Sequence, residues 1–572
     1  MVKEKSIYDE LGEERKSLQE KGLLPEWVTT LAWQILKEKY LSDEWPDLKS
    51  VYTRVAKHAA QYTDNPSHWE TKFFNLFWNG WLAASTPVLS NMGTGRGCPV
   101  SCSGNYVDDS VKSFYSKQVE TAILSKNGFG TSSYLGAIRP RGSDITGIKG
   151  GASGVLPVFK DYVQLSRDVS QGSQRRGAWA GYIEIDHPDF FELVNYITKN
   201  PDDVNIGWNI TDKFIERLDA GDPDAIERYQ KALKMKMITG KGYFFKVDTV
   251  NRLAPQMYKD KEIKVLASNL CSEVALASGF YEGEDYTFSC VLSSMNASKY
   301  DEWKNTTAVF DATVFLDCVN QDLIEIGKDI PELESVVRFA EKSRALGLGV
   351  LGYHTYLQEQ RIPFESFNAK LKNTEIFKYI NEESLKASQW MAKEWGEPEW
   401  CKGYGVRNTH RIAIAPNLSS ALICGSVSQG IEPIYKNAYI QNTAAGKVNR
   451  INPVLLDIMK EREVYNDKVI SDIIKNNGSV QHVSWLSDEE KEVFKTAFEI
   501  NQMEIIRQAS SRQRFIDQAQ SINLFFGAEE SEEYISEVHK EALKDQYIKS
   551  LYYIRSESGV IVNKDECTSC HA

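Results

Sequence analysis

Four stretches rich in glycine, serine and threonine decide how the fold is interpreted: SNMGTGRG at 90–97, NGFGTSS at 127–133, GIKGGASG at 147–154 and SQGSQRRGAWAG at 170–181. Such stretches cannot all lie inside helices or strands, because glycine weakens both and serine and threonine favour turns. They indicate several tight loops carried on one scaffold. Beyond them, strand-like and helical segments alternate to about residue 440, which is typical of an α/β fold.

The segments on either side of this region have a different character. Apolar residues between 24 and 35 recur at roughly helical spacing, and Pro46 separates them from a second helical pattern at 48–62. Residues 453–546 are charged and helical in period, and the chain after Gly559 is polar and short of core residues. We therefore expect an N-terminal helical region and a flexible C-terminal tail.

Length and composition limit the class of protein. The chain has 572 residues, of which 42% are hydrophobic and 26% charged, as in a soluble protein of several domains or one large barrel with additions. No apolar run is long enough for a membrane span, and residues 1–16 lack the core of a secretory signal, so we expect a cytoplasmic protein. A net charge of −12 argues against a nucleic-acid polymer as partner but permits sites for small phosphates. Nine cysteines are too few for a disulfide scaffold and indicate reduced thiols.

Two familiar motifs occur in the wrong context. Residues 347–352 match the GxGxxG pattern of dinucleotide sites, but the residues before them, 333–344, are helical in pattern, whereas such a site follows a strand. A nicotinamide-dependent oxidoreductase is therefore only a distant alternative. Glu184 and His187 form an ExxH motif, but the Asp186-His-Pro-Asp segment would interrupt a helix there. Since no second such motif exists to complete a di-iron site, we expect no metal site in this chain.

The cysteines carry the chemistry. Cys567 and Cys570 form a CxxC that is either half of a zinc site or a redox pair, and the lack of a second CxxC favours the redox pair. Cys271 lies in Asn269-Leu-Cys-Ser-Glu273, after a strand-like segment at 263–267. On a strand, the amide, thiol and carboxylate would face the same side. This suggests a radical or nucleophilic cysteine with a base beside it, although a buried structural cysteine fits the spacing equally well.

An ordered series of motifs covering nearly the whole chain resembles the large, catalytic subunit of class I ribonucleotide reductases. The motifs are STPVLSN at 85–91, GCPVSC at 97–102, NGFGTS at 127–132, QRRGAWAGYIE at 174–184, NLCSE at 269–273, FSCVL at 288–292, RALGLGVLGYH at 344–354, APNLSSA at 415–421, QAQSINLF at 518–525, IKSLYYIR at 548–555 and CTSC at 567–570.

The resemblance implies a fold and a division of the chain. The fold is a ten-stranded α/β barrel, made of two five-stranded parallel halves, with a finger loop through its centre that carries Cys271 at its tip. Residues 1–80 would form the N-terminal helical region, 81–555 the barrel and 556–572 the redox tail. The chain passes almost at once into the catalytic helices, so we expect the compact form without an N-terminal ATP-cone and without inhibition by dATP through such a cone.

The resemblance also implies a mechanism. A thiyl radical on Cys271 would remove the ribose 3′-hydrogen, with Glu273 as base toward the 3′-OH and Asn269 bound to the sugar hydroxyls. Cys102 and Cys290 would supply protons and electrons and end as a disulfide. Counting back from Asp109-Ser110, as in the family, selects Cys102 over Cys98. This intact set argues against a catalytically inactive nucleotide sensor.

In the class I family a separate, metal-containing small subunit supplies the radical. By this resemblance, Tyr553 would receive it and Tyr552 would pass it to Cys271, and no cofactor would be tightly bound to this chain. Thioredoxin or glutaredoxin would reduce Cys567 and Cys570, which in turn would reduce the disulfide. An adenosylcobalamin-dependent (class II) reductase, which needs no tyrosine pair, is the closest alternative.

Nucleotide sites follow from the same resemblance. Substrate diphosphates, with Mg²⁺, would contact Thr86, Ser101, Gly128, Asn417, Leu418, Ser419 and Ser420. A dNTP or ATP effector would contact Asp109, Ser110 and Arg139 near a homodimer interface. Its identity would be reported to the substrate base by a loop that includes Ser173, Gln174, Arg175 and Arg176.

Overall fold

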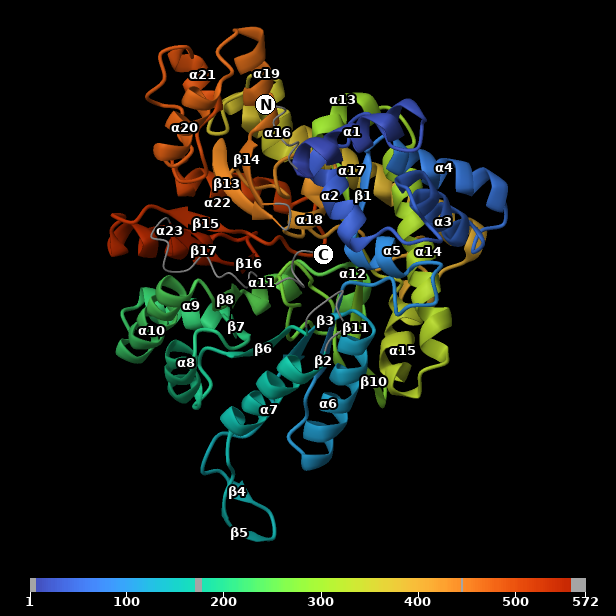
Figure 1. Cartoon of the computed structure of the whole chain (residues 1–572). Coiled ribbons are helices and arrows are strands. Elements are labelled where there is room, and N and C mark those ends of the chain that lie inside the picture. Colours follow the sequence, from blue (N-terminus) through green and yellow to red (C-terminus); the bar gives the residue numbers. More distant parts are fainter. Residues whose placement is uncertain (1–6, 170–176, 444–445, 557–572) are drawn as a thin grey trace.

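The computed structural model describes residues 7–169, 177–443 and 446–556. The expected tail cysteines, Cys567 and Cys570, and the loop residues Ser173, Gln174, Arg175 and Arg176 lie outside these ranges. The described chain opens with helices that pack on one side of the molecule (Figure 1). They are α1 (Ile7–Glu20), α2 (Thr30–Lys39), α3 (Leu48–Ala60) and α4 (Pro66–Trp78).

The helical pattern at 48–62 corresponds to α3. Asp47 begins this helix with a capping box, because its side chain accepts from Ser50 N at 2.8 Å and the Ser50 side chain accepts from the Asp47 backbone. The apolar face of α3 contacts α4, the short helix α5 (Thr86–Asn91) and α14 (Ala308–Lys328). The N-terminal helices are thereby joined to the rest of the fold.

Five parallel strands form the first half of the barrel. In chain order they are β2 (Cys102–Tyr106), β3 (Gly130–Tyr134), β6 (Trp179–Glu184), β7 (Asn205–Asn209) and β8 (Tyr243–Phe245). Each strand pairs in parallel with the next along the chain, as successive βαβ units do.

In the second half, too, each strand lies parallel to the next along the chain, but fewer residues pair between most neighbouring strands. β11 (Phe288–Asn296) pairs in parallel with β12 (Leu346–Leu351). Single parallel bridges continue from Leu348 to Ile412 and from Ile414 to Gln520. β15 (Leu524–Phe526) then pairs in parallel with β17 (Ile554–Ser556), which follows β16 (Ser550–Leu551).

Two antiparallel seams close the ring. β11 pairs with β2, and β16 pairs with β8. With 412–414, 520–526 and 550–556 each taken as one strand position, the ring has ten positions, five in each parallel half. The predicted ten-stranded α/β barrel is confirmed.

Helices between successive strands cover the outside of the barrel (Figure 1). In the first half they are α6 (Val111–Lys126), α7 (Val155–Asp168), α8 (Phe190–Lys199), α9 (Asp212–Asp219) and α10 (Pro223–Thr239). In the second half the main helices are α14, α15 (Glu334–Ser343), α16 (Tyr353–Glu359), α17 (Phe367–Trp395), α19 (Pro453–Glu461), α20 (Asp467–Lys475), α21 (Asp488–Val493), α22 (Gln502–Gln513) and α23 (Glu532–Lys544). The helical pattern predicted for 453–546 corresponds to α19 to α23, with β15 as an interruption.

The other described elements are short. They are β1 (Leu82–Ala84), β4 (Asp144–Ile145), β5 (Ile148–Gly151), α11 (Val247–Arg252), α12 (Gln256–Asp260), β9 (Gly279–Tyr281), β10 (Glu284–Tyr286), the 3-10 turns η1 (Ala297–Lys299), η2 (Pro331–Leu333) and η3 (Glu399–Cys401), α13 (Tyr300–Trp303), α18 (Leu418–Ile423), β13 (Ala438–Thr443) and β14 (Gly446–Ile451). None of the helices in the described ranges combines the length and apolarity needed to cross a membrane.

Alternation along the strands separates an inner from an outer core. On β8, Tyr243 and Phe245 belong to the apolar cluster inside the barrel, whereas Phe244 belongs to the larger cluster beneath the helices. β11 alternates in the same way about Val291. Since successive strand side chains point to opposite faces, strands such as β6, β8 and β11 contribute to both cores.

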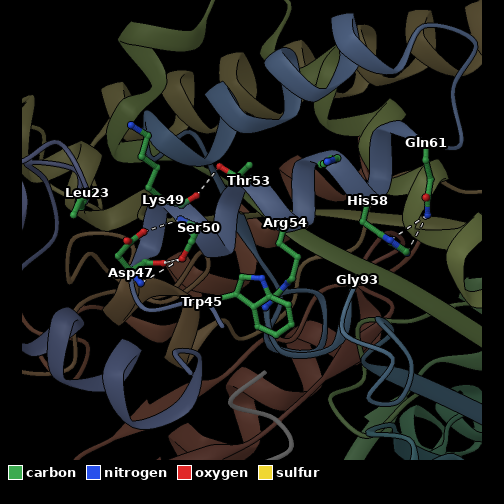
Figure 2. Close-up of a pocket in the computed structure, with 11 residues that line it drawn as sticks. Leu23, Trp45, Asp47, Lys49, Ser50, Thr53, Arg54, His58, Gln61 and Gly93 are labelled. Atoms are coloured by element: carbon green, nitrogen blue, oxygen red, sulfur yellow. Dashed lines mark hydrogen bonds between the residues drawn. The ribbon is translucent and has the colours of Figure 1, made fainter. Parts of the chain in front are cut away.

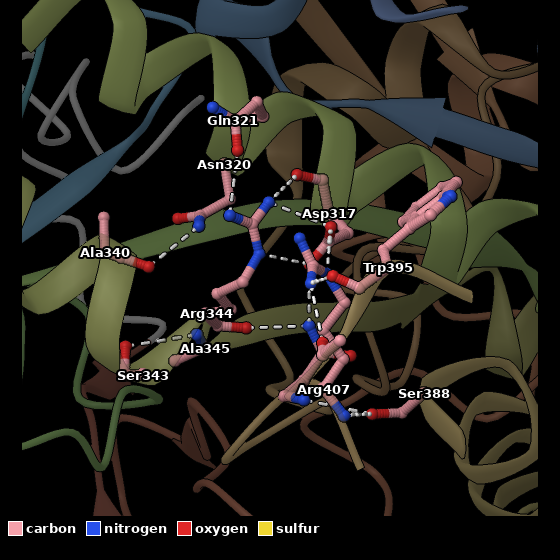
Figure 3. A network of polar contacts seen from close by, with 12 residues as sticks. Asp317, Asn320, Gln321, Ala340, Ser343, Arg344, Ala345, Ser388, Trp395 and Arg407 are labelled. Atoms are coloured by element: carbon pink, nitrogen blue, oxygen red, sulfur yellow. Dashed lines mark hydrogen bonds and ion pairs between the residues drawn. The ribbon is translucent and has the colours of Figure 1, made fainter. Parts of the chain in front are cut away.

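A buried ion-pair network joins α14 to the chain beside β12 (Figure 3). Asp317 Oδ2 lies 2.9 Å from Arg344 Nη2 and 3.0 Å from Arg407 Nε. Burial by itself would raise the pKa of Asp317, but the two guanidinium groups lower it to about 2. Because loss of one member would leave a buried charge without a partner, the network fixes the chain where β12 begins.

Gly347 and Gly349 of the GxGxxG pattern lie inside β12 and not at a turn from strand to helix. A Cβ atom on Gly347 would lie 2.6 Å from Leu292 Cδ2 and 2.9 Å from Cys290 Sγ. These glycines therefore permit close packing of β12 on β11, which explains the motif without a dinucleotide.

Candidate active site

The segment between α12 and β9 passes through the interior of the barrel. Both halves hold it: the Ser132 hydroxyl donates to Ser268 O at 2.8 Å, and Ala519 N donates to Glu273 O at 2.8 Å. The Tyr182 hydroxyl donates to Asn269 O at 2.6 Å and the Ser521 hydroxyl to Cys271 O at 2.6 Å. Four hydrogen bonds to its main chain, from β3, β6 and the chain at 519–521, fix this segment as a finger loop.

A turn at the tip of the finger loop, and not a strand, brings the predicted residues together. Residues 263–267 form no strand, so the expected extended presentation was wrong. Ser272 has φ +63°, in the left-handed region, and its N–H donates to Asn269 O at 3.3 Å. Asn269 Oδ1 also accepts from Val274 N at 3.2 Å. The turn places Asn269 and Glu273 on either side of Cys271, and all three side chains are buried.

Two further cysteines face this tip from the seam between the barrel halves. Cys290 on β11 and Cys102 on β2 are directly opposite each other in an antiparallel pair. Opposite residues in such a pair have Cα atoms about 4.5–5.5 Å apart, which is within the range for a disulfide without backbone movement. Neither forms a disulfide within the described chain, and Asn269 Nδ2 donates to Cys102 Sγ at 3.3 Å. Cys98 instead belongs to the outer core.

Electrostatics at the tip favour protonated groups. Burial raises the pKa of Glu273 to about 7, although hydrogen bonds from Asn269 and Ser521 oppose the rise. Burial, followed by the charges of Glu273 and Cys102, raises the pKa of Cys290 well above its usual value. Near neutral pH, Glu273 can therefore accept or release a proton, while the Cys290 thiol retains its proton.

Sequence reasoning missed Gln518 and Ser521 as parts of this site. Gln518 Oε1 accepts from Ala275 N at 3.1 Å, and its Nε2 donates to Leu346 O at 2.7 Å. The Ser521 hydroxyl, besides contacting Cys271 O, lies 3.2 Å from Glu273 Oε2. Both residues lie in the QAQSINLF motif, which could have marked them.

The tyrosine pair forms part of a cluster of three rings. The ring centroids of Tyr552 and Tyr553 are 4.0 Å apart, and Tyr243 on β8 lies 5.0 Å and 5.7 Å from them. The hydroxyls of Tyr243 and Tyr553 are 3.4 Å apart. Tyr552 is buried in the same apolar cluster as Cys271, whereas Tyr553 is only partly buried. Tyr553 therefore lies nearer the surface than Tyr552. No sequence signal marked Tyr243.

The expected phosphate contacts lie at short elements around the seam. Thr86 begins α5 and its hydroxyl is 2.8 Å from the Tyr40 hydroxyl. Ser101, just before β2, is buried, and its hydroxyl has no hydrogen-bond partner in the described chain. Gly128 has φ +99° in the turn before β3.

Asn417 begins α18 with φ +61°, and Leu418, Ser419 and Ser420 form the first turn of that helix. The Ser294 hydroxyl on β11 donates to Asn417 Oδ1 at 3.1 Å, which joins the helix start to the barrel. α18 packs on β1, the strand that leads into α5. The backbone N–H groups in the first turn of α18 have no intrahelical acceptors, so this turn can receive an anion.

The expected effector residues lie at the start of α6. Arg139 Nε donates to Asp109 Oδ2 at 2.6 Å, and Ser110 caps α6 by accepting from Ser113 N at 3.2 Å. Val111, Tyr115 and Val119 form an apolar stripe along α6, with exposures of 69%, 59% and 53%. Spacing of four residues places them on one face of the helix.

A cavity of about 630 Å³ on the N-terminal helices is separate from this site (Figure 2). Trp45 and several residues of α3, including Arg54 and His58, line this cavity. None of the predicted site residues lines it. Within residues 7–169, 177–443 and 446–556, no group of three or more His, Cys, Asp or Glu could hold a metal ion.

Comparisons with known proteins agree with this geometry. The family model described as "Ribonucleotide reductase, barrel domain" matches residues 100–226, 224–403 and 398–554, and "Ribonucleotide reductase, all-alpha domain" matches 26–97. The putative ribonucleoside-diphosphate reductase large subunit of Frog virus 3 is 34% identical, over 95% of this chain and 98% of the relative.

A solved structure, the Actinobacillus ureae class Id ribonucleotide reductase alpha subunit, matches with a TM-score of 0.85 and 39% identity, over 93% of this chain and 98% of that one. The vitamin B12-dependent ribonucleoside-diphosphate reductase of Thermoplasma acidophilum is 29% identical over 86% of this chain and 66% of the relative.

Proposed function

This chain belongs to the family of ribonucleotide reductase large subunits, and we propose that it reduces ribonucleoside diphosphates to 2′-deoxyribonucleoside diphosphates through a thiyl radical on Cys271. The observation that carries the proposal is the opposed pair Cys102 and Cys290 beside the buried Asn269 and Glu273 at the tip of the finger loop.

The chemistry balances with these groups. The Cys271 thiyl takes the 3′-hydrogen and becomes a thiol, while Glu273 accepts the 3′-OH proton. A thiol proton from the Cys102–Cys290 pair lets the 2′-OH leave as water. The pair also supplies two electrons and its second hydrogen, which is added at C2′, and ends as a disulfide. Glu273 returns its proton to the 3′-oxygen, and Cys271 finally returns a hydrogen atom to C3′ and becomes a thiyl again. The buried site protects the radical intermediates from water.

The tyrosine cluster supports delivery of the radical from outside. A small subunit would oxidise Tyr553, and the hole would pass through Tyr552 to Cys271. Tyr553 is partly exposed and Tyr552 is buried, so the two residues join the surface to the interior. An alpha subunit of class I relies on such a partner, and the metal would belong to that partner.

The surrounding residues support assignments for nucleotides and partners. The unsatisfied Ser101 hydroxyl and the α18 start suit a Mg²⁺-bound diphosphate, and Thr86 at the start of α5 and Gly128 in the turn before β3 would add contacts. Asp109, Ser110 and Arg139 would receive a dNTP or ATP, and the apolar stripe on α6 would form the homodimer interface. Cys567 and Cys570 would be reduced by thioredoxin or glutaredoxin. The chain would divide into the N-terminal helical region at 1–80, the barrel at 81–555 and the redox tail at 556–572.

One experiment tests this function against the cobalamin-dependent alternative. CDP reduction is measured with dithiothreitol, with and without a candidate small subunit, and with adenosylcobalamin alone. We expect turnover only with the small subunit. Tyr552→Phe should abolish turnover and still bind CDP and effector, whereas Tyr286→Phe, outside the relay, should remain active. Turnover with adenosylcobalamin alone would overturn the class I assignment.

A further inference from the structure

Lys236 on α10 is fully buried and bonds to backbone carbonyls. Its side chain is 0% exposed, and its Nζ donates to Gly242 O at 3.0 Å and, over a short contact, to Tyr552 O. No carboxylate of the described chain lies within ion-pair distance of it. A buried lysine without a counter-charge is costly, and burial lowers the pKa of Lys236 to about 7.

Both carbonyls that accept from Lys236 lie at the tyrosine cluster. Gly242 immediately precedes Tyr243, and the other acceptor is the backbone of Tyr552. Asn205 makes a second connection between the same strands, because its Oδ1 accepts from Gly242 N at 3.1 Å and its Nδ2 donates to the Tyr553 hydroxyl at 3.3 Å. The β8–β16 seam itself has only two paired positions. Backbone bonds hold the pair on its other side, where Tyr552 N donates to Ile522 O at 2.8 Å and Leu524 N to Tyr553 O at 3.0 Å, whereas side chains supply the links toward β8.

We propose that Lys236 is a positioning residue of the tyrosine relay, which holds the Tyr552 backbone against Gly242 and so sets the spacing of Tyr243, Tyr552 and Tyr553. The inference rests on the proposed function. Ring centroids separated by 4.0 Å and 5.0 Å leave little tolerance for displacement. Since transfer between aromatic groups depends on their separation and orientation, release of Tyr552 O would slow transfer without touching the substrate.

The surroundings of Lys236 are otherwise neutral near pH 7. From β8, the Phe244 ring lies 5.7 Å from Nζ, and from β16 the acceptor is a carbonyl. From α23, His539 contributes an imidazole whose pKa is lowered to about 3, first by burial and then by Lys236. Both the ammonium and the neutral amine have at least two N–H groups, enough for the two carbonyls.

Lys246 provides a matched control on the same seam. It is also buried, and its Nζ donates to Ala542 O at 3.3 Å and to Asp545 O. These carbonyls lie at the end of α23 and belong to no relay residue. Loss of either lysine removes the same buried group from two backbone carbonyls, but only Lys236 contacts a relay tyrosine.

The experiment places 3-aminotyrosine at position 552 as a radical trap in the full chain and mixes it with the small subunit, CDP and effector. Electron paramagnetic resonance measures the trapped radical in the Lys236→Met, Lys246→Met and unsubstituted backgrounds. Turnover and CDP binding are measured on the same substitutions with the natural tyrosine. We expect Lys236→Met to lower the radical yield and kcat by about tenfold or more, with KM for CDP within about twofold. Lys246→Met should keep both values within about twofold of the unsubstituted chain.

Three results overturn the inference. Radical yield and kcat may be unchanged in Lys236→Met, or Lys246→Met may lose as much as Lys236→Met. If the unsubstituted chain traps no radical at 552, the relay itself, and with it the proposed class I function, is refuted. If a methionine variant does not fold, Lys236→Leu and Lys246→Leu, which also lack a hydrogen-bond donor, are compared under the same criteria.

Discussion

Glu273 illustrates how a single residue obtains its chemistry from burial. Its carboxylate lies inside an apolar barrel and receives a hydrogen bond from Ser521 at 3.2 Å. The loss of hydration dominates, so its pKa rises to about 7. A surface glutamate with the same neighbours in sequence would be fully ionised at neutral pH.

We expect the rate of CDP reduction to depend on this ionisation. The base form is required, so kcat/KM should fall as pH decreases below about 7, approaching about tenfold per unit. Glu273→Gln should lower kcat by about 10² to 10⁴-fold. Initial rates between pH 5.5 and 8.5, with the small-subunit radical quantified at each pH, check this. A flat profile with a stable radical would contradict the assignment.

Cys102 and Cys290 should differ sharply in function from Cys98. Cys102 and Cys290 face each other across the seam, whereas Cys98 is packed in the outer core. Cys102→Ser or Cys290→Ser should reduce turnover by about 100-fold or more, because serine cannot form a disulfide. Cys98→Ala should keep turnover within about threefold and lose only packing stability.

Peptide mapping after reaction with CDP in the absence of external thiol provides the direct measurement. We expect a peptide that links 102 to 290 in a chain with Cys567→Ser and Cys570→Ser, where the tail cannot reduce the disulfide, and in the same chain with Cys98→Ala. A crosslink from Cys98, or none at all despite product formation, would contradict the role of the pair.

At the scale of elements, α6 combines two tasks. Its start carries Asp109 and Ser110, and its outer face carries the apolar stripe of Val111, Tyr115 and Val119. An apolar stripe of this length on a surface helix indicates a protein partner. A second copy of α6 is the simplest occupant, because a two-fold interface brings the same patch together from both subunits.

We therefore expect Val119→Glu to weaken dimerisation. An unpaired carboxylate in an apolar interface is unfavourable, so the dimer dissociation constant should rise by at least about tenfold, or 1.4 kcal/mol. Ile238→Glu is the control, since Ile238 on α10 is also exposed, at 45%, but lies outside the stripe. Sedimentation velocity with effector present distinguishes them, and equal constants for both variants would refute the interface.

At the scale of the whole molecule, buried lysines shape the pH dependence of stability. Burial lowers the pKa of Lys236 to about 7 and those of Lys246 and Lys549 to about 8. In the unfolded chain the lysine pKa is about 10.4. Between these values the unfolded state binds more protons, so the free energy of unfolding rises with pH.

We expect the urea midpoint to increase between about pH 7 and 8.5. Above that range the buried cysteines oppose the trend. Burial raises their pKa values in the folded state, so at higher pH the unfolded chain loses its thiol protons first and the free energy of unfolding falls. Lys246→Met should show a shallower rise. Midpoints that stay constant or fall over this range would show that the lysines are not desolvated as the structure indicates.

The sequence by itself determined the family and the α/β barrel, and it predicted which cysteines react. Motif order is a local property, and residues such as Cys271 with Glu273, or Tyr552 with Tyr553, lie within two positions of each other in the chain. Alternation of strand and helix patterns is likewise written in short segments, because side-chain periodicity follows backbone geometry directly.

Only the tertiary structure decided which groups act on these residues. Segments hundreds of residues apart meet in the barrel, as when Ser521 contacts Glu273, Tyr243 packs on Tyr552, and Lys236 reaches the Tyr552 carbonyl. The finger tip is a left-handed turn and not the strand that alternation suggested, because contacts from both barrel halves outweigh local propensity. Burial, and with it the pKa of Glu273 and Lys236, is a property of the closed barrel and of no segment alone.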